Sequence, residues 1–172
     1  FVAASASMIY LILRKDMRAL QESEERLSLA AWASGQGLWD WDITSGDIYL
    51  SPKYYEMAGY KPSELHPSFE FLRNNIHSDD LPTVERVIEK HFQGQSEYPV
   101  LEYRLKKASG VYIWTRGIGK VVERDGNGSP IRMIGTISDI TEQKEAEEKL
   151  HLQSAMLQAS ASVAGAAPLP SQ

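Results

Sequence analysis

Two groups of acidic side chains have a spacing that acid–base or metal chemistry can use. Asp40 and Asp42 are neighbours on one face of an alternating segment, and His77, Asp79 and Asp80 are close together in the sequence. A hard cation needs several converging oxygen ligands, and an acid–base pair needs a pocket that sets two pKa values apart. Neighbouring residues alone meet neither requirement, so we predict no metal site and no catalytic residue. We expect Asp79 or Asp80 to cap a helix, and Asp40 and Asp42 to accept hydrogen bonds from loop amides.

Four aromatic side chains are candidates for binding a flat ligand. Trp39, Trp41, Tyr55 and Trp114 offer faces on which a flavin ring can stack. Packing in a small hydrophobic core is the alternative interpretation for all four. The sequence has no Cys, which excludes a flavin held as a cysteinyl adduct, a disulfide and a thiolate zinc site. The cofactor hypotheses that stay open are a non-covalent flavin and a small metabolite.

Three further pocket candidates lie on strands expected near the end of the core. They are Tyr103, Arg116 and Thr136, which complete the predicted ligand site. Arg116 can bind a carboxylate through two parallel N–H donors. An ion pair with Glu102 or Glu123 on the same sheet is the alternative for this side chain.

The pattern of residues 35–141 predicts the elements that must position these side chains. Period-2 alternation, turn residues and apolar stripes at helical spacing distinguish strands from helices. The expected order is strands at 38–43 and 48–50, helices at 52–57 and 69–76, a longer helix opening at 77–82 and ending at Gly94, and strands at 97–106, 111–123 and 131–140. This order predicts an α+β fold, with one antiparallel sheet carrying helices on one face.

The segments before the core predict a membrane-proximal helix. Residues 1–13 are almost entirely apolar and are followed by Arg14 and Lys15, as at the cytoplasmic end of a membrane span. Because a span needs about 20 apolar residues, we expect residues 1–15 to be the end of a transmembrane helix. This places the core in the cytoplasm at the inner membrane. A buried helix of a soluble protein is the alternative, and a signal peptide is disfavoured because the basic residues follow the apolar run.

Two charged helices are expected to flank the core. Residues 16–34 place Met17, Leu20, Leu27 and Ala31 at coiled-coil spacing, which favours an amphipathic linker helix that pairs in a homodimer. Packing of this helix on its own domain is the alternative. A second charged helix is expected at 142–158, followed by a disordered tail at 159–172. The chain carries 23 acidic residues against 18 Lys and Arg, so nucleic-acid binding is not expected.

The core at 35–141 resembles a PAS domain with its C-terminal PAC segment, of the subtype with a Trp-rich first strand. No single motif is specific, but their order and spacing together carry the resemblance. The matching residues are 37–43 (Gly-Leu-Trp-Asp-Trp-Asp-Ile), Ser51-Pro52, Tyr60, Pro62, Glu64-Leu65, 76–80, Tyr103-Arg104, 114–117, 125–130, Gly135 and Asp139-Ile140-Thr141.

The resemblance implies a five-stranded antiparallel sheet in the order 2-1-5-4-3, with a pocket between the sheet and short helices. Domains of this family bind a small ligand or cofactor, dimerise and signal through flanking helices. The resemblance also implies that Asp139, Ile140 and Thr141 form a signal hinge ahead of a linker helix at 142–158. In haem-binding members the ligating His lies early in the long helix, where this chain has Thr83, so haem is disfavoured and His91 is expected to pack.

We therefore expect a sensory input and dimerisation module of a membrane-associated signal-transduction protein, with a histidine kinase or diguanylate cyclase domain downstream. The sequence shows no nucleotide-binding Gly loop and no nucleophile with a base, so the chain itself is expected not to be an enzyme. The alternative is a constitutive dimerisation scaffold that binds no ligand.

Overall fold

A five-stranded antiparallel sheet forms the centre of the protein. The computed structural model describes residues 2–165, and the strands lie in the order β2-β1-β5-β4-β3, which confirms the predicted fold and strand order. The elements are α1 (Val2–Ala33), β1 (Gly37–Asp42), β2 (Ile48–Leu50), α2 (Pro52–Ala58), the 3-10 helix η1 (Pro62–Glu64), α3 (Phe69–Asn75), α4 (Leu81–Phe92), β3 (Val100–Lys106), β4 (Tyr112–Arg124), β5 (Pro130–Asp139) and α5 (Thr141–Gly165).

Polar turn residues shape two of the hairpins of the sheet. Between β1 and β2, the Asp42 carboxylate accepts hydrogen bonds from the amides of Thr44 and Ser45, at 2.8 and 3.0 Å. This confirms the expected role of Asp42 and begins the turn at the end of the Trp-rich strand. The same expectation is wrong for Asp40, whose carboxylate accepts from the guanidinium of Arg132 on β5 instead. Between β4 and β5, Asp125 accepts from the amides of Asn127 and Ser129 in the same way.

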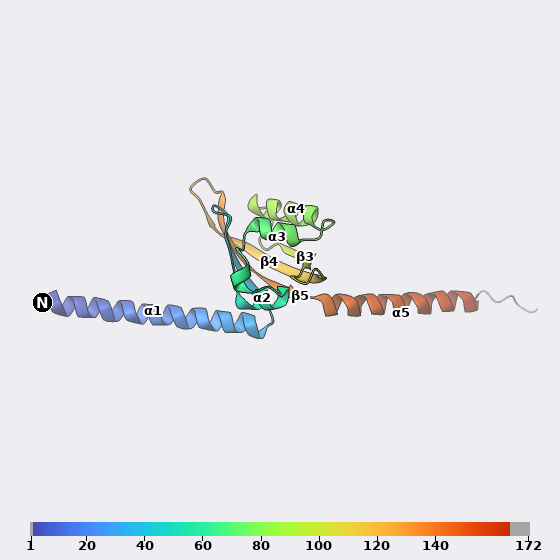
Figure 1. Cartoon of the computed structure of the whole chain (residues 1–172), viewed down its shortest axis with the longest axis horizontal. Coiled ribbons are helices and arrows are strands. Elements are labelled where there is room, and N and C mark those ends of the chain that lie inside the picture. The colour runs from blue at the N-terminus through green and yellow to red at the C-terminus, as the bar shows by residue number, and fades with distance from the viewer. Residues whose placement is uncertain (1, 166–172) are drawn as a thin grey trace, which may run out of the picture.

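The helices α2, α3 and α4 lie on one face of the sheet (Figure 1). The core forms between the two layers, because β1 turns its Trp side chains and β2 turns Ile48 and Leu50 toward the helices. Tyr54 and Ala58 of α2 are almost fully buried there. Burial of apolar area at about 25 cal/mol per Å² is the main stabilising term for such a layer.

Two polar residues that directly precede helices bind distant strands, including Asp80, for which a helix cap was expected. Ser51 precedes α2, but its hydroxyl accepts a hydrogen bond from the amide of Leu38 at 2.8 Å and so ties the helix start to β1. Asp80 precedes α4, and its carboxylate accepts from the amide and guanidinium of Arg104 on β3. Both side chains thus connect distant elements, and neither caps its own helix.

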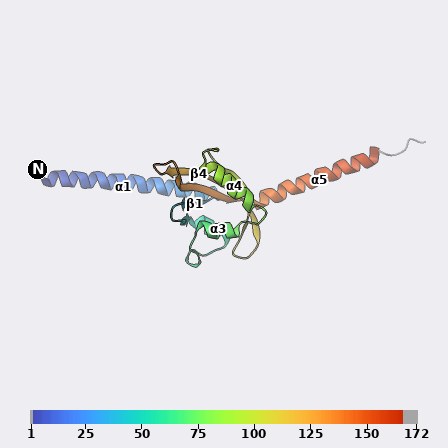
Figure 2. The same ribbon diagram turned by 90° about the horizontal axis from the view of Figure 1, so that it is seen from above.

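The helices α1 and α5 extend away from the core on opposite sides in both views (Figures 1 and 2). Helix α1 is continuous, so the segments predicted separately at 1–15 and 16–34 form one element from Val2 to Ala33. No helix within residues 2–165 is long and apolar enough to cross a membrane. Helix α5 continues to Gly165, so residues 159–165 of the predicted disordered tail are helical, and 166–172 lie outside the described residues.

Candidate functional site

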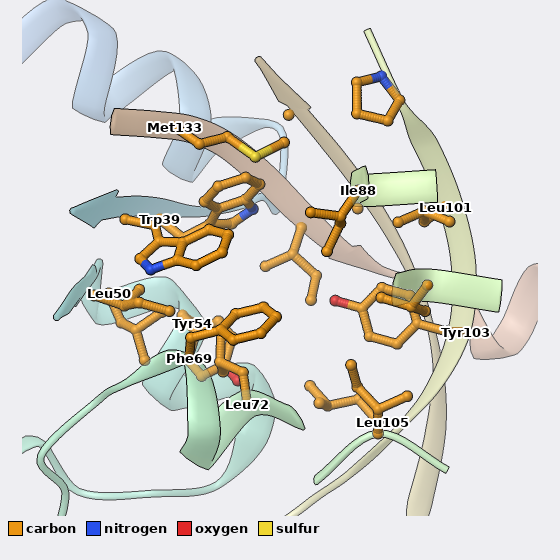
Figure 3. A pocket seen from close by; sticks show the side chains of 18 residues that line it. Trp39, Leu50, Tyr54, Phe69, Leu72, Ile88, Leu101, Tyr103, Leu105 and Met133 are labelled. Carbon is orange, nitrogen blue, oxygen red and sulfur yellow. The ribbon is translucent and has the colours of Figure 1, made fainter. Parts of the chain in front are cut away.

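An apolar cavity lies between the sheet and the helices. It offers about 90 Å³ to the centre of a water-sized sphere. Side chains of β1, β3, β5 and α4 surround it, and Figure 3 shows the ring of Tyr103 turning its hydroxyl toward the interior. Among the described residues that line the cavity, none has a charged side chain. The arrangement therefore suits an uncharged ligand in a dry site.

The structure places three of the seven predicted pocket residues at this cavity and four elsewhere. Trp39, Trp41 and Tyr103 line it. Tyr55 packs at the edge of the core, with its ring 6.2 Å from that of Tyr54. The remaining three candidates, which lie on β4 and β5, are Trp114, Arg116 and Thr136.

These last three side chains point to the opposite face of the sheet. Side chains alternate along a strand, and on β4 it is Ile113 and Thr115 that are buried toward the helices. Trp114 and Arg116 are therefore on the outer face, and Thr136 pairs with Ile118 on that face of β5. Arg116 donates both Nε–H and Nη2–H to Oε1 of Glu102, at 2.9 and 2.7 Å. The ion pair that was the alternative for Arg116 is thus formed.

Glycines create the room that the first Trp occupies. A Cβ at Gly119 would come within 2.7 Å of Trp39 Cη2, and one at Gly135 would overlap the same indole. Trp39 therefore packs against β4 and β5 at two positions that have no side chain. The glycine pair at 117 and 119, on one face of β4, is the sequence signal that could have indicated this side of the cavity.

Several cavity residues were absent from the sequence-based site because each is an ordinary apolar side chain. They include Leu72 of α3, Ile88 of α4, Leu101 of β3 and Met133 of β5. Helical periodicity predicts that Ile88 is internal, but it does not distinguish a residue that fills the core from one that borders a cavity.

Three of the residues that line the cavity, Trp41, Tyr54 and Tyr103, carry a polar group. Trp41 is 8% exposed and stacks on Phe69, with 4.3 Å between ring centroids. Its buried Nε1–H has no hydrogen-bond partner within the described part of the chain. Burial raises the pKa of Tyr103 to about 12 and raises the pKa of Tyr54 further, so both hydroxyls stay neutral at physiological pH.

Neither a flavin nor a haem fits the described residues. Ligand pockets generally measure about 300–1,000 Å³, and this cavity is well below that range. The ring of His91 is occupied on both nitrogens, because Nε2 accepts from the amide of Val121 at 2.9 Å and Nδ1 lies 2.7 Å from the carbonyl of Ser96. His91 therefore joins α4 to β4 and leaves no nitrogen for an iron.

The predicted hinge connects the sheet to α5 by three hydrogen bonds. The amide of Thr141 donates to Oδ1 of Asp139 at 2.9 Å, and the Thr141 hydroxyl accepts from the amide of Trp114 at 3.0 Å. The amide of Ile140 donates to the carbonyl of Trp114 at 2.8 Å. Helix α5 thus begins in direct contact with β4.

A charged cluster on the outer face of the sheet holds the first turn of α5. Lys144 lies 2.6 Å from Oε2 of Glu102, and its Nζ is 5.6 Å from the centroid of the Trp114 ring. The hydrogen bonds from Lys144 and from Arg116 lower the pKa of Glu102 below its ordinary range. We call Glu102, Trp114, Arg116 and Lys144 the α5 clamp. From the sequence, Trp114 and Arg116 were expected at the pocket and Glu102 was named as an alternative partner of Arg116, whereas Lys144 was not singled out.

Comparison with known proteins identifies the family. The profile of the family described as the PAS fold matches residues 47–137, more than half of the chain. The solved structure of a sensory box histidine kinase/response regulator from Burkholderia thailandensis is 31% identical with a TM-score of 0.68, over 78% of this chain and 98% of that one. The chain therefore belongs to the PAS family, as the sequence motifs predicted.

Curated relatives place such domains within signalling proteins. An uncharacterised protein of Sinorhizobium fredii, y4lL, is 34% identical over 137 residues, and the probable diguanylate cyclase DgcE of Escherichia coli is 25% identical over 138. The alignments cover 79% and 80% of this chain but 16% and 12% of the relatives. The chain is thus a PAS sensory domain homologous to those of histidine kinases and diguanylate cyclases, and it spans a small part of these relatives.

Proposed function

We propose that this chain is a non-catalytic sensory input module of a histidine kinase or diguanylate cyclase, in which the state of the cavity biases the position of α5. The observation that carries the proposal is that β3 and β4 contribute residues both to the cavity and to the α5 clamp. Tyr103 and Gly117 border the cavity, while the adjacent Glu102 and Arg116 belong to the α5 clamp on the other face. A shift of these strands on ligand binding would move both faces together.

The coupling need only be modest to act as a signal. Allosteric coupling free energies are typically about 1–3 kcal/mol, which changes a two-state equilibrium by about 5- to 150-fold. A single exposed ion pair contributes about 0–1 kcal/mol. The ion pairs of the α5 clamp therefore reach the range of allosteric coupling free energies only when they act together.

A kinase fusion tests this function. The chain is joined through α5, in helical register, to a histidine kinase catalytic core, and autophosphorylation is measured. Gly117→Ala adds a methyl group inside the cavity, at 3.5 Å from the Tyr103 ring, whereas Gly126→Ala adds one where no atom lies within 4 Å. We expect Gly117→Ala to change kinase output at least twofold and Gly126→Ala to leave it unchanged.

The scaffold alternative predicts a different result from the same fusion. It is favoured by the small volume of the cavity, because the protein's own Trp39 fills the room left by Gly119 and Gly135. If both Gly variants signal like the wild type while deletion of α1 abolishes activity, the core is a scaffold and the sensory proposal is wrong.

Dimerisation through α1 and α5 is part of the same proposal. Met17, Leu20 and Leu27 of α1 are 61–71% exposed, and Leu150 and Leu157 of α5 are exposed to a similar degree. Helices of this length with apolar side chains in water are stabilised by a partner. Two copies of the chain that pair α1 with α1 and α5 with α5 would cover these positions.

We also propose that α1 associates with a membrane. Residues 8–13 present six large apolar side chains that are all more than half exposed, and Arg14, Lys15 and Arg18 follow at once. Such a segment can enter the interface of an anionic bilayer while its basic residues contact headgroups. Flotation with anionic vesicles tests this, and Leu11→Asp combined with Ile12→Asp should abolish it. Flotation that is unaffected by the double substitution would contradict the proposal.

A further inference from the structure

We propose that the domain has a second input, in which protonation of His77 opens the turn before α4 and weakens the contacts that hold α5. This input goes beyond the proposed function, because His77 is not among the residues that line the cavity. The two inputs share only the output helix α5.

The ring of His77 closes the turn that leads into α4, and it does so only when it is neutral. Its Nδ1 lies 3.2 Å from the amide nitrogen of Asp79 and accepts the hydrogen bond from that N–H. A neutral imidazole accepts at one nitrogen, whereas both nitrogens of a protonated ring are donors. Protonation of His77 therefore places a donor opposite the amide of Asp79, and this hydrogen bond is lost.

The carboxylate of Asp79 offers the protonated ring a different partner. Its Oδ2 is 3.6 Å from Nδ1 of His77 and 3.4 Å from Nη2 of Arg104. The charged imidazole and the guanidinium therefore compete for the same oxygen. Protonation of His77 draws Asp79 toward the imidazole and away from Arg104.

The ring of His77 is accessible to solvent and is also held in place. Its side chain is 25% exposed, and its ring packs against that of Tyr112 with 4.8 Å between centroids. The titratable and charged groups of the elements packed against this ring are Asp79 and Asp80 in its own turn, Arg104 and Lys106 on β3, and Tyr112 on β4.

The pH window of the input is set by the chemistry of imidazole. Among unperturbed side chains, only imidazole changes its charge between pH 5 and pH 8. The hydrogen bonds from Arg104 lower the pKa of Asp80, and those from Lys144 and Arg116 lower the pKa of Glu102. Both carboxylates therefore stay ionised in this window, and their contacts persist while the charge of His77 changes.

A row of contacts on the outer face of the sheet connects this turn to α5. Asp80 binds Nη2 of Arg104 at 2.8 Å, and the guanidinium carbon of Arg104 is 5.5 Å from the centroid of the Trp114 ring. Lys144 of the α5 clamp lies 5.6 Å from the same centroid. Cations within about 6 Å of a Trp ring are attracted to its face. A shift of Arg104 therefore changes the ring that also holds Lys144.

Hydrogen exchange of the full chain at two pH values tests this input. Exchange is measured by mass spectrometry at pH 5.5 and pH 7.5 and is corrected for the intrinsic pH dependence of amide exchange. We expect residues 79–84 and 141–150 of the wild type to exchange about twofold or more faster at pH 5.5, because one hydrogen bond of the turn is lost.

Matched variants assign the effect to His77 and to the row of contacts. His77→Asn keeps an acceptor near the position of Nδ1 but does not titrate, so its exchange should be slow at both pH values. His151→Asn removes an exposed imidazole of α5 itself and should keep the pH effect of the wild type. Lys144→Met should keep the effect at 79–84 and reduce it at 141–150, because it removes the last contact of the row.

Three results would overturn the proposal. The first is equal exchange of the wild type at 79–84 at the two pH values. The second is a pH effect that survives in His77→Asn or disappears in His151→Asn. The third is a response at 79–84 without one at 141–150, because the opened turn would then have no effect on α5.

Discussion

Single side chains in this domain join elements that are far apart in the sequence. Asp80 at the start of α4 accepts three hydrogen bonds from Arg104 of β3, two of them at 2.8 Å. Its residue type and its place before a helix predict a cap, and only the tertiary structure brings Arg104 to it. The same holds for Ser51, whose hydroxyl reaches Leu38 on β1. Local sequence identifies such residues but not their partners.

Asp80 should make the domain sensitive to acid. Its hydrogen bonds from Arg104 lower its pKa, so folded Asp80 binds fewer protons than the unfolded chain at the same pH. Its stabilising contribution is complete above about pH 4 and is lost as the pH falls further. In urea unfolding between pH 6 and pH 3, Asp80→Asn should be less stable than wild type at pH 6 and lose less stability on acidification.

The control for this prediction is Asp16→Asn in α1, an exposed carboxylate. It should leave the pH profile of the unfolding free energy unchanged. An Asp80→Asn profile parallel to that of the wild type would show that the Arg104 contact does not contribute to acid sensitivity.

We expect His91 to contribute substantially to the free energy of unfolding. It is 4% exposed, and its Nε2 is the acceptor for the amide of Val121. His91→Leu keeps the volume but leaves that amide unpaired in the core, which should cost about 1–3 kcal/mol of unfolding free energy. His66→Leu, at an exposed position, should change stability by less than about 0.5 kcal/mol. Equal effects of the two changes in urea unfolding would contradict the role of His91.

At the scale of elements, the sequence predicted the order and type of strands and helices well, but not which face of β4 is internal. On β1 the polar Asp40 and Asp42 alternate with two Trp residues, so the buried face is evident. On β4 apolar side chains occur on both faces, with Ile113 inside and Trp114 outside. Alternation is therefore uninformative there, which is why Trp114, Arg116 and Thr136 were expected at the pocket.

The junction of β5 and α5 should depend more on Thr141 than on Asp139. Asp139 is exposed and binds one amide, whereas the Thr141 hydroxyl is the acceptor for the partly buried amide of Trp114. Thr141→Val should cost about 1 kcal/mol and speed hydrogen exchange at the start of α5. Asp139→Ala should cost less and cause a smaller change. The opposite ranking in exchange measured by mass spectrometry would contradict the larger role of Thr141 among the three predicted hinge residues.

At the scale of the whole molecule, α1 and α5 extend away from a compact core (Figure 1). Both helices expose apolar side chains along much of their length. This division agrees with the proposed function, in which α1 and α5 carry the dimer contacts on either side of a sensory core. The composition of the sequence predicted both helices but divided each of them into segments of different character. In the structure α1 is continuous and α5 extends to Gly165, because adding a residue to an existing helix is much easier than starting a new one.

Dimerisation should be sensitive to the exposed apolar positions of α1. Replacing Leu20 and Leu27 together by Glu places charges at the proposed helix contact and should convert a dimer to a monomer in light scattering coupled to size-exclusion chromatography. In the control, Gln replaces Glu22 and Glu25, which do not lie on the helix face that carries Leu20 and Leu27. A dimer that survives the Leu replacements would exclude the proposed α1 contact.

The central claim, that the cavity and α5 are coupled through β3 and β4, is tested most directly by hydrogen exchange at residues 141–150. Exchange is compared in wild type, Gly117→Ala, Gly126→Ala and the double variant Gly117→Ala with Lys144→Met. The account predicts that the methyl group at position 117 changes exchange in the first turns of α5, that the one at 126 does not, and that the effect shrinks when Lys144 no longer binds Glu102. Altered exchange in β4 with unchanged exchange at 141–150 would contradict it.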